Sequence, residues 1–220
     1  LKAKPLNTSG TIARVNSQNS RRLSHLERRS FEALEMDELT KALIETVNFA
    51  AIKHRHQQRK DGHTPYINHP IGVARILTHE AGIYDLTTIQ AAILHDTVED
   101  TDTTPEEIEE HFGSRVRAIV DEVTDDKRLP SEVRKRLQIE HAPHSSHEAK
   151  LVKLADKLYN LRDLSATSPL GWNEQRVQAY FEWSEKVVHG LRGTNKPMEQ
   201  ALDQVFEARR ALNDKIPKSK

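Results

Sequence analysis

The strongest candidate for chemistry is a run of ionisable side chains at the end of an apolar segment. His95 and Asp96 are adjacent, and Glu99 and Asp100 follow one helical turn later. In a helix, residues four apart share a face, so His95 would neighbour Glu99 and Asp96 would neighbour Asp100. Carboxylates this close repel one another unless a cation or a proton lies between them. The run therefore indicates a metal site, and the alternative is a solvated helix end.

Three further positions favour the metal site. Asp156 lies beside the apolar stripe of a helix predicted at 146–165, where a carboxylate without a partner is costly. Asn160 follows one turn later on the same face and is placed to orient a ligand or a bound water. His69 directly precedes Pro70, which we predict to be the first residue of a helix. The resulting ligand set is His69, His95, Asp96 and Asp156.

Imidazole and carboxylate ligands together suit Mn, Fe, Zn or Mg in a site that keeps open positions for water and substrate. A metal ion lowers the pKa of bound water and neutralises charge on a phosphoryl oxygen. Glu99 and Asp100 would then be free to orient or deprotonate that water. This chemistry is suited to hydrolysis of a phosphate ester.

The segments that carry these residues are predicted to be helices. From Asp37 onward, apolar residues recur at helical spacing with few strand-like runs, and Asp37 is placed to cap the first helix. Pro70 is predicted to start a helix that Gly82 ends. Thr87 or Thr88 is predicted to cap the next helix, which continues through the acidic run to residue 100.

The helix after the acidic run has the clearest boundaries. Thr104, Pro105 and Glu107 form a capping box with proline at the first helical position, and Gly113 follows the last turn. Further helices are predicted at about 115–124, 131–141, 146–165, 173–191 and 197–212. The sequence therefore predicts an all-α domain.

Composition limits the classes of protein and of partner. The chain of 220 residues contains no cysteine, which excludes disulfides and thiolate metal sites and favours a reducing, cytoplasmic setting. Lys plus Arg and Asp plus Glu number 33 each, so no global basic field favours nucleic acid. No apolar run approaches the roughly 20 residues of a membrane helix. We expect a small-molecule partner, without nucleic acid or membrane.

The two ends differ from the domain predicted at 37–212. Residues 1–36 are rich in Ser, Arg and Asn and poor in apolar residues, which predicts a disordered tail. The same composition also fits a mitochondrial targeting segment, although its amphipathic pattern is weak. Residues 213–220 are predicted to be a short C-terminal tail.

Several strings resemble one known family. TPYINHPIGVARIL, AAILHDTVEDTDTT, VTDDKRLP and VKLADKLYNLRDL resemble the hydrolase domain of RelA/SpoT-type alarmone enzymes, within the HD phosphohydrolase superfamily. The similarity is closest to the small stand-alone metazoan SpoT homologues and covers roughly residues 37–212. It implies a compact, multi-helix HD-domain fold.

The resemblance also implies an activity. The family removes the 3′-pyrophosphate of guanosine 3′,5′-bis(diphosphate), or ppGpp, giving GDP and pyrophosphate with one Mn²⁺ per site, for which Zn²⁺ or Fe²⁺ are alternatives. The chain has no room for the synthetase domain of the long bacterial enzymes. An NADPH 2′-phosphatase using the same site is the alternative activity, and a nucleotide sensor without turnover is the alternative from another class.

By motif, the resemblance implies that His69, His95, Asp96 and Asp156 bind the metal and that Glu99 and Asp100 activate water. The implied substrate-binding residues are Arg59, Lys60, Asn160, Arg176 and Tyr180. Physical chemistry agrees, because a guanidinium can stack on a base and an ammonium can meet phosphate. Arg176 and Tyr180 are four apart on one predicted helix, where the alternative is an ordinary surface pair.

Overall fold

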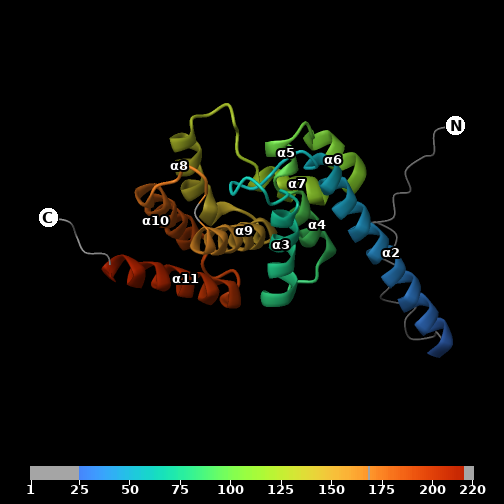
Figure 1. Cartoon of the computed structure of the whole chain (residues 1–220). Coiled ribbons are helices and arrows are strands. Elements are labelled where there is room, and N and C mark those ends of the chain that lie inside the picture. The colour runs from blue at the N-terminus through green and yellow to red at the C-terminus, as the bar shows by residue number, and fades with distance from the viewer. Residues whose placement is uncertain (1–24, 168, 216–220) are drawn as a thin grey trace. The chain divides into compact units, whose positions relative to one another are not determined.

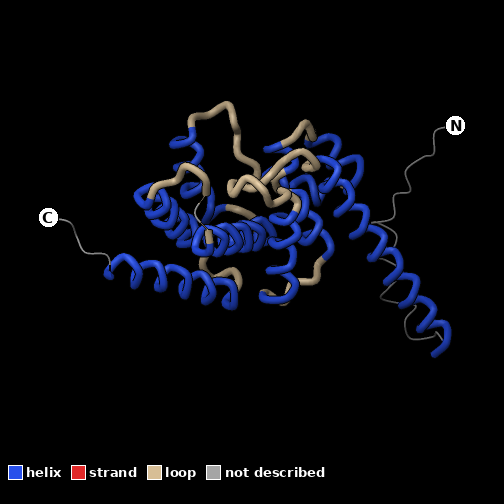
Figure 2. Tube along the Cα trace, in the orientation of Figure 1, coloured by secondary structure: helices blue, strands red, loops and turns tan. Residues whose placement is uncertain are grey.

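The computed structural model describes residues 25–167 and 169–215 and is built from helices (Figure 1). Within these residues there is no β-strand, and a single isolated bridge joins Gln58 and Pro65 (Figure 2). The helices are α2 (His25–Lys53), α3 (Asn68–Arg75), the π-helical turn η1 (Ile76–Glu80), α4 (Leu86–Leu94), α5 (Thr97–Asp100), α6 (Pro105–Phe112), α7 (Ser114–Val123), α8 (Ser131–His141), the 3₁₀ turn η2 (Ala142–His144), α9 (His147–Ala166), α10 (Glu174–Leu191) and α11 (Lys196–Lys215). The predicted all-α class is confirmed.

Among the described residues, the chain divides into two units, a smaller one that ends at Ile44 and a larger one that begins at Glu45. The larger unit is organised around α9, which packs against α3, α4, α7, α10 and α11 (Figure 1). The stripe predicted for this helix is fully buried and contains Leu151, Leu154, Ala155, Leu158 and Leu161. Each buried leucine contributes about 1.5–3 kcal/mol relative to an exposed one, so this stripe fixes α9 as the rigid base of the unit.

The predicted helix boundaries after residue 100 are largely confirmed. Thr104 accepts a hydrogen bond from the Glu107 amide, Pro105 is the first residue of α6, and Gly113 follows it with φ of +87°. The observed α7, α8, α9 and α10 lie within one residue of their predictions at each end. At the C-terminus the prediction of a tail from residue 213 is wrong in part, since α11 continues to Lys215. No glycine or proline interrupts the sequence until Pro217.

Three predicted helix starts are corrected. Asp37 is no cap, because α2 already begins at His25 and no glycine or proline breaks 25–53. Helix α3 begins at Asn68, two residues before Pro70, because the Asn68 side chain and the His69 amide bond to carbonyls of the preceding turn. Asp85 caps α4 in place of Thr87 or Thr88, accepting bonds from both the amide and the hydroxyl of Thr88. The tail predicted over residues 1–36 is wrong for 25–36, which belong to α2, while residues 1–24 and 216–220 lie outside the described residues.

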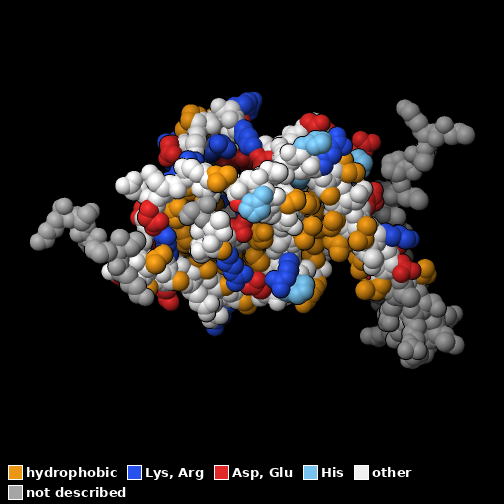
Figure 3. Space-filling view, in the orientation of Figure 1, with side chains coloured by type: hydrophobic (Ala, Val, Ile, Leu, Met, Phe, Trp, Pro, Cys, Tyr) orange, Lys and Arg blue, Asp and Glu red, His pale blue; other side chains and the backbone are white. Residues whose placement is uncertain are grey.

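The surface agrees with the balanced composition, since acidic and basic side chains are interspersed on the face in Figure 3. Among the described residues, no helix combines the length and the apolar character needed to cross a membrane.

Close packing between α3 and α9 depends on Gly72. A Cβ atom at this position would lie 2.0 Å from Cε2 of Tyr159, well inside van der Waals contact. The Tyr159 ring in turn packs edge-on against His69, with ring centroids 4.9 Å apart. Gly72 therefore lets α3 approach α9 closely enough to place His69.

We expect Gly72→Ala to lower the free energy of unfolding by about 1–3 kcal/mol, because the added methyl group overpacks this contact. The higher helix propensity of alanine, worth about 1 kcal/mol, offsets only part of the loss. Urea denaturation measures the change, with Ile71→Ala, at a position 42% exposed on the same helix, as the control. A Gly72→Ala protein at least as stable as wild type would contradict this account of the packing.

Candidate metal and phosphate-ester site

The helix predicted to continue through residue 100 is broken at His95 and Asp96. Helix α4 ends at Leu94, and α5 begins at Thr97. The Thr97 hydroxyl donates to the Leu94 carbonyl oxygen at 2.7 Å and so replaces a backbone partner. In a continuous helix, neighbouring side chains diverge by about 100°. The break instead brings Nε2 of His95 to 3.1 Å from Oδ2 of Asp96, so both can face one ion.

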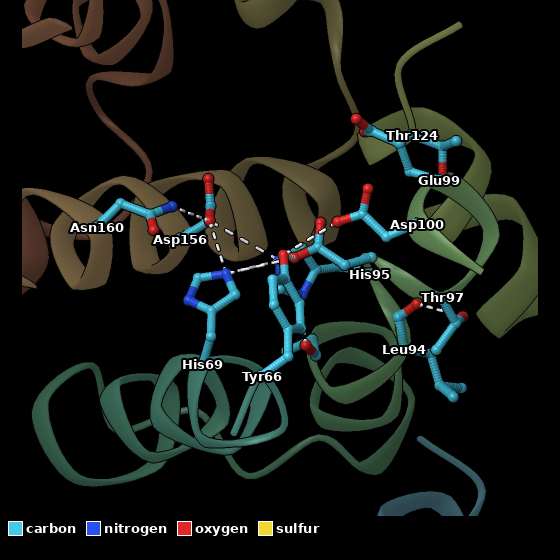
Figure 4. A network of polar contacts seen from close by, with 12 residues as sticks. Tyr66, His69, Leu94, His95, Thr97, Glu99, Asp100, Thr124, Asp156 and Asn160 are labelled. Atoms are coloured by element: carbon cyan, nitrogen blue, oxygen red, sulfur yellow. Dashed lines mark hydrogen bonds and ion pairs between the residues drawn. The ribbon is translucent and has the colours of Figure 1, made fainter. Parts of the chain in front are cut away.

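Four candidate ligand atoms converge from three parts of the fold, and Figure 4 shows the side chains of His69, His95 and Asp156 among them. His69 comes from α3, His95 and Asp96 from the break between α4 and α5, and Asp156 from α9. The Nε2 atoms of His69 and His95 are 3.2 Å apart. Oδ1 of Asp156 lies 3.2 Å from Nε2 of His69 and 3.7 Å from that of His95, while Oδ2 of Asp96 lies 3.5 Å from Nε2 of His69.

These four residues fit a divalent cation. Ligand atoms about 2.1 Å from a metal and at right angles to one another are roughly 3 Å apart, close to the separations found here. Nδ1 of His95 donates to the Ala92 carbonyl at 2.8 Å, which directs Nε2 into the cluster, where a metal would replace its proton. His69, His95 and Asp156 also have ligand atoms that all lie within 4.8 Å of one another.

Electrostatics favour positive charge at this point. Burial lowers the pKa of His95, but the carboxylates of Asp96 and Asp156 outweigh it and hold that pKa well above its usual value. For the Asp156 carboxyl both effects have the opposite sign. Burial raises its pKa, but Lys157 and the two histidines hold that pKa well below its usual range. The cluster thus has two half-buried anionic carboxylates, which favour a cation beside them.

Two side chains from α9 fix the orientation of Asp156. Asn160 donates to Oδ1 of Asp156 at 2.6 Å, the contact expected of an amide one turn away. Lys157 donates to the other oxygen, Oδ2, at 2.9 Å and is itself 6% exposed. Its Nζ lies 4.8 Å from the ring centroid of Trp183. Sequence reasoning missed Lys157, although a lysine next to a buried aspartate was the available signal.

Glu99 and Asp100 occupy different places relative to the cluster. Asp100 points toward it, and Glu99 lies farther away beside Thr124 (Figure 4). Oδ2 of Asp100 is 3.1 Å from the Tyr66 hydroxyl, and Oδ1 pairs with Lys127. The carboxylate of Glu99 accepts from the Asp125 amide at 3.1 Å and from Arg134 at 3.4 Å. Burial raises the pKa of Glu99 to about 7.

A cavity of about 460 Å³ opens above the cluster, and a second of about 170 Å³ adjoins it. Of the predicted substrate-binding residues, the structure brings four to the walls of both cavities, namely Arg59, Lys60, Asn160 and Tyr180. Besides the predicted residues, the larger cavity is lined by Tyr66, Lys127, Arg134, Lys153, Lys157 and Trp183, which sequence reasoning missed.

The guanidinium of Arg59 donates to Asn160 and to Asp163, each at 2.8 Å. Lys60 has no carboxylate partner within the described residues, and its Nζ lies 5.2 Å from the ring centroid of Trp172. Arg176 lines neither cavity but stacks on the same indole ring, 4.3 Å from its centroid. The second cavity thus has an aromatic and basic rim.

Comparison with known proteins finds a matching family model, similar sequences and a similar solved structure. A family model described as HD domain matches residues 46–180. The guanosine-3′,5′-bis(diphosphate) 3′-pyrophosphohydrolase MESH1 of Mus musculus is 68% identical over 76% of this chain and 94% of its own length, and that of Homo sapiens is 67% identical over the same shares. A solved structure described by the words "a metazoan ortholog of SpoT hydrolyzes ppGpp and plays a role in starvation responses" is 53% identical, with a TM-score of 0.75, over 76% of this chain and 95% of that one.

Proposed function

This chain belongs to the HD domain family, and from that membership we propose that it hydrolyses guanosine 3′,5′-bis(diphosphate) to GDP and pyrophosphate. The observation that carries the proposal is the convergence of two imidazoles and two carboxylates at the floor of a cavity with basic walls. A pyrophosphate ester needs both features, a cation where charge develops and donors for the remaining phosphoryl oxygens.

We propose Mn²⁺ as the ion, held by His69, His95, Asp96 and Asp156, with Zn²⁺ and Fe²⁺ as alternatives. Two nitrogen and two oxygen ligands without thiolate suit all three ions. When bound, the ion neutralises charge on a phosphoryl oxygen and lowers the pKa of a coordinated water.

The carboxylates of Asp100 and Glu99 act on the attacking water. Asp100 lies beside the cluster and accepts the proton as the water oxygen bonds to phosphorus. The bond from phosphorus to the ribose 3′ oxygen breaks, and this oxygen takes a proton from solvent to leave as a hydroxyl. Its hydrogen bond with Tyr66 and its ion pair with Lys127 hold it in position. Glu99 lies on the rim, where it orders Arg134 and the backbone at Asp125 and assists proton removal.

The substrate nucleoside occupies the smaller cavity, with its 3′-pyrophosphate over the cluster. Arg59 and Tyr180 offer a guanidinium and a ring between the two cavities, and Lys60 is a cation without a carboxylate partner that can meet phosphate. Arg176 acts through its stacking on Trp172 at the edge of that cavity. Asn160 joins the nucleotide side to the metal side because it contacts both Arg59 and Asp156.

Side-by-side turnover of ppGpp and NADPH by the purified, Mn²⁺-loaded chain tests the proposal. We expect GDP and pyrophosphate in equal amounts, with ppGpp having the higher kcat/KM. Release of inorganic phosphate from NADPH at the higher kcat/KM would instead identify a 2′-phosphatase. Nucleotide binding without product would identify a sensor.

A further inference from the structure

Tyr66 makes a contact that joins the metal cluster to the proposed base. Its hydroxyl donates to Oδ2 of Asp96 at 2.6 Å and lies 3.1 Å from Oδ2 of Asp100 (Figure 4). One hydroxyl carries one proton, so the two carboxylates share it, with the shorter hydrogen bond to Asp96 and the longer one to Asp100. A predicted metal ligand and a predicted base thus share one phenol.

The Tyr66 ring is held on several sides. The ring of His54, which is 2% exposed, stacks on it with centroids 4.8 Å apart and planes inclined by 29°. His69 packs edge-on against it at 5.9 Å, and the guanidinium of Arg59 lies 5.7 Å from its centroid. Because these neighbours restrict both side-chain torsions, the hydroxyl has one accessible position.

Gln57 connects Tyr66 and Asp100 through hydrogen bonds to a backbone group of each. Its carbonyl accepts from the Tyr66 amide at 3.0 Å, and its side-chain amide donates to the Asp100 carbonyl at 2.5 Å. The Gln57 side-chain oxygen is 2.7 Å from Nδ1 of His54. The chain entering the 57–66 loop therefore fixes Tyr66 and Asp100 with respect to each other.

We propose that Tyr66 is a positioning residue that orients Asp96 for the metal and Asp100 for the attacking water through a single hydroxyl. Without it, among the described residues, the side chain of Asp96 keeps its contacts with the two histidines, and that of Asp100 keeps its pair with Lys127. Both carboxylates then gain rotational freedom, which weakens metal binding and misplaces the base. The rate component of this proposal rests on the proposed hydrolysis, and the metal component does not.

Tyr66→Phe tests the proposal because it removes the hydroxyl and preserves the ring. We expect the Mn²⁺ affinity, measured by titration calorimetry on metal-free protein, to fall about 10–100-fold. At saturating Mn²⁺ we expect kcat to fall about 10–100-fold with KM within threefold, since the nucleotide contacts remain. Tyr84→Phe, at a position 77% exposed, is the matched control and should leave all three quantities unchanged.

A double-mutant cycle shows whether Tyr66 acts through Asp100. In an Asp100→Asn background, Tyr66→Phe should lower kcat by no more than about threefold, because its target is already disabled. Wild-type Mn²⁺ affinity in Tyr66→Phe, or a rate loss that persists in full in the double mutant, would overturn the proposal. If the wild-type chain fails to cleave ppGpp, the proposed function fails, and the Mn²⁺ titration still decides the role of Tyr66.

Discussion

His95→Ala and Asp156→Ala are each expected to abolish stoichiometric metal binding and to lower ppGpp turnover by about 10³-fold or more. Each change removes one of four ligands, and the charge stabilisation that a metal gives a phosphoryl transition state amounts to several kcal/mol. Roughly 4 kcal/mol corresponds to a factor of 10³ in rate. Elemental analysis of the purified proteins, alongside single-turnover rates, measures both quantities.

The two substitutions should differ in stability. Asp156→Ala leaves Lys157 buried without its carboxylate partner, which costs roughly 3–5 kcal/mol in the free energy of unfolding. His95→Ala leaves the Asp96 carboxylate its contacts with Tyr66 and His69 and should therefore cost less. Asp203→Asn, which removes a half-exposed partner of Arg192, is the control and should retain metal and rate. One equivalent of tightly bound Mn²⁺ in either ligand variant would refute the assignment of that residue.

Asp100→Asn and Glu99→Gln are expected to keep metal and nucleotide binding and to lose about 10²-fold or more in single-turnover rate. The amides preserve shape and can still accept hydrogen bonds, but they cannot take a proton from water. Asp100→Asn should have the larger effect because its carboxylate points toward the cluster (Figure 4). Rates within a few-fold of wild type in both variants would end the water-activation proposal, and loss of metal in either would make that carboxylate a ligand.

The pH dependence of the wild-type rate gives a second measurement for Glu99. Its carboxyl has a pKa raised to about 7 by burial, and only the deprotonated form can accept a proton. The rate should therefore fall as the pH drops through 7, which gives the pH profile an acidic limb. A bound cation nearby lowers the pKa of Glu99 and so moves this limb to lower pH. Glu99→Gln should lose that limb. A pH profile with the same limb in the variant would assign the titration to another group.

Helix positions were predictable where the chain contains its own boundary signals. Thr104, Pro105 and Gly113 satisfy or replace backbone groups locally, so the limits of α6 follow from a short stretch of sequence. The start of α2 could not be predicted in this way. Asp37 resembles a helix cap, although the residues before it are good helix formers. Where two local preferences compete, the sequence pattern alone does not decide between them.

The predictable part of the site consists of side chains whose burial without a partner would cost free energy. Asp156 stood out because a carboxylate beside a buried stripe requires a partner. The break in the helix at His95 and Asp96 was missed because it depends on a hydrogen bond. The Thr97 hydroxyl donates to the Leu94 carbonyl oxygen instead of to water. Tyr66 was missed because nothing in its local sequence indicates that its hydroxyl reaches two acids some thirty residues away. Such contacts arise from packing between helices and have no local pattern.

The ligands come from α3, the break between α4 and α5, and α9, so the complete set exists only in the folded chain. If the proposed site binds metal, free metal acts as a folding ligand for this protein, because the unfolded chain has no comparable site. At a free concentration of 100 times Kd, this linkage adds about 2.7 kcal/mol to the free energy of unfolding. Chelation would shift the melting temperature downward, and the size of the shift would report the metal affinity without any substrate. We therefore expect the amount of folded protein in a cell to depend on the supply of this metal.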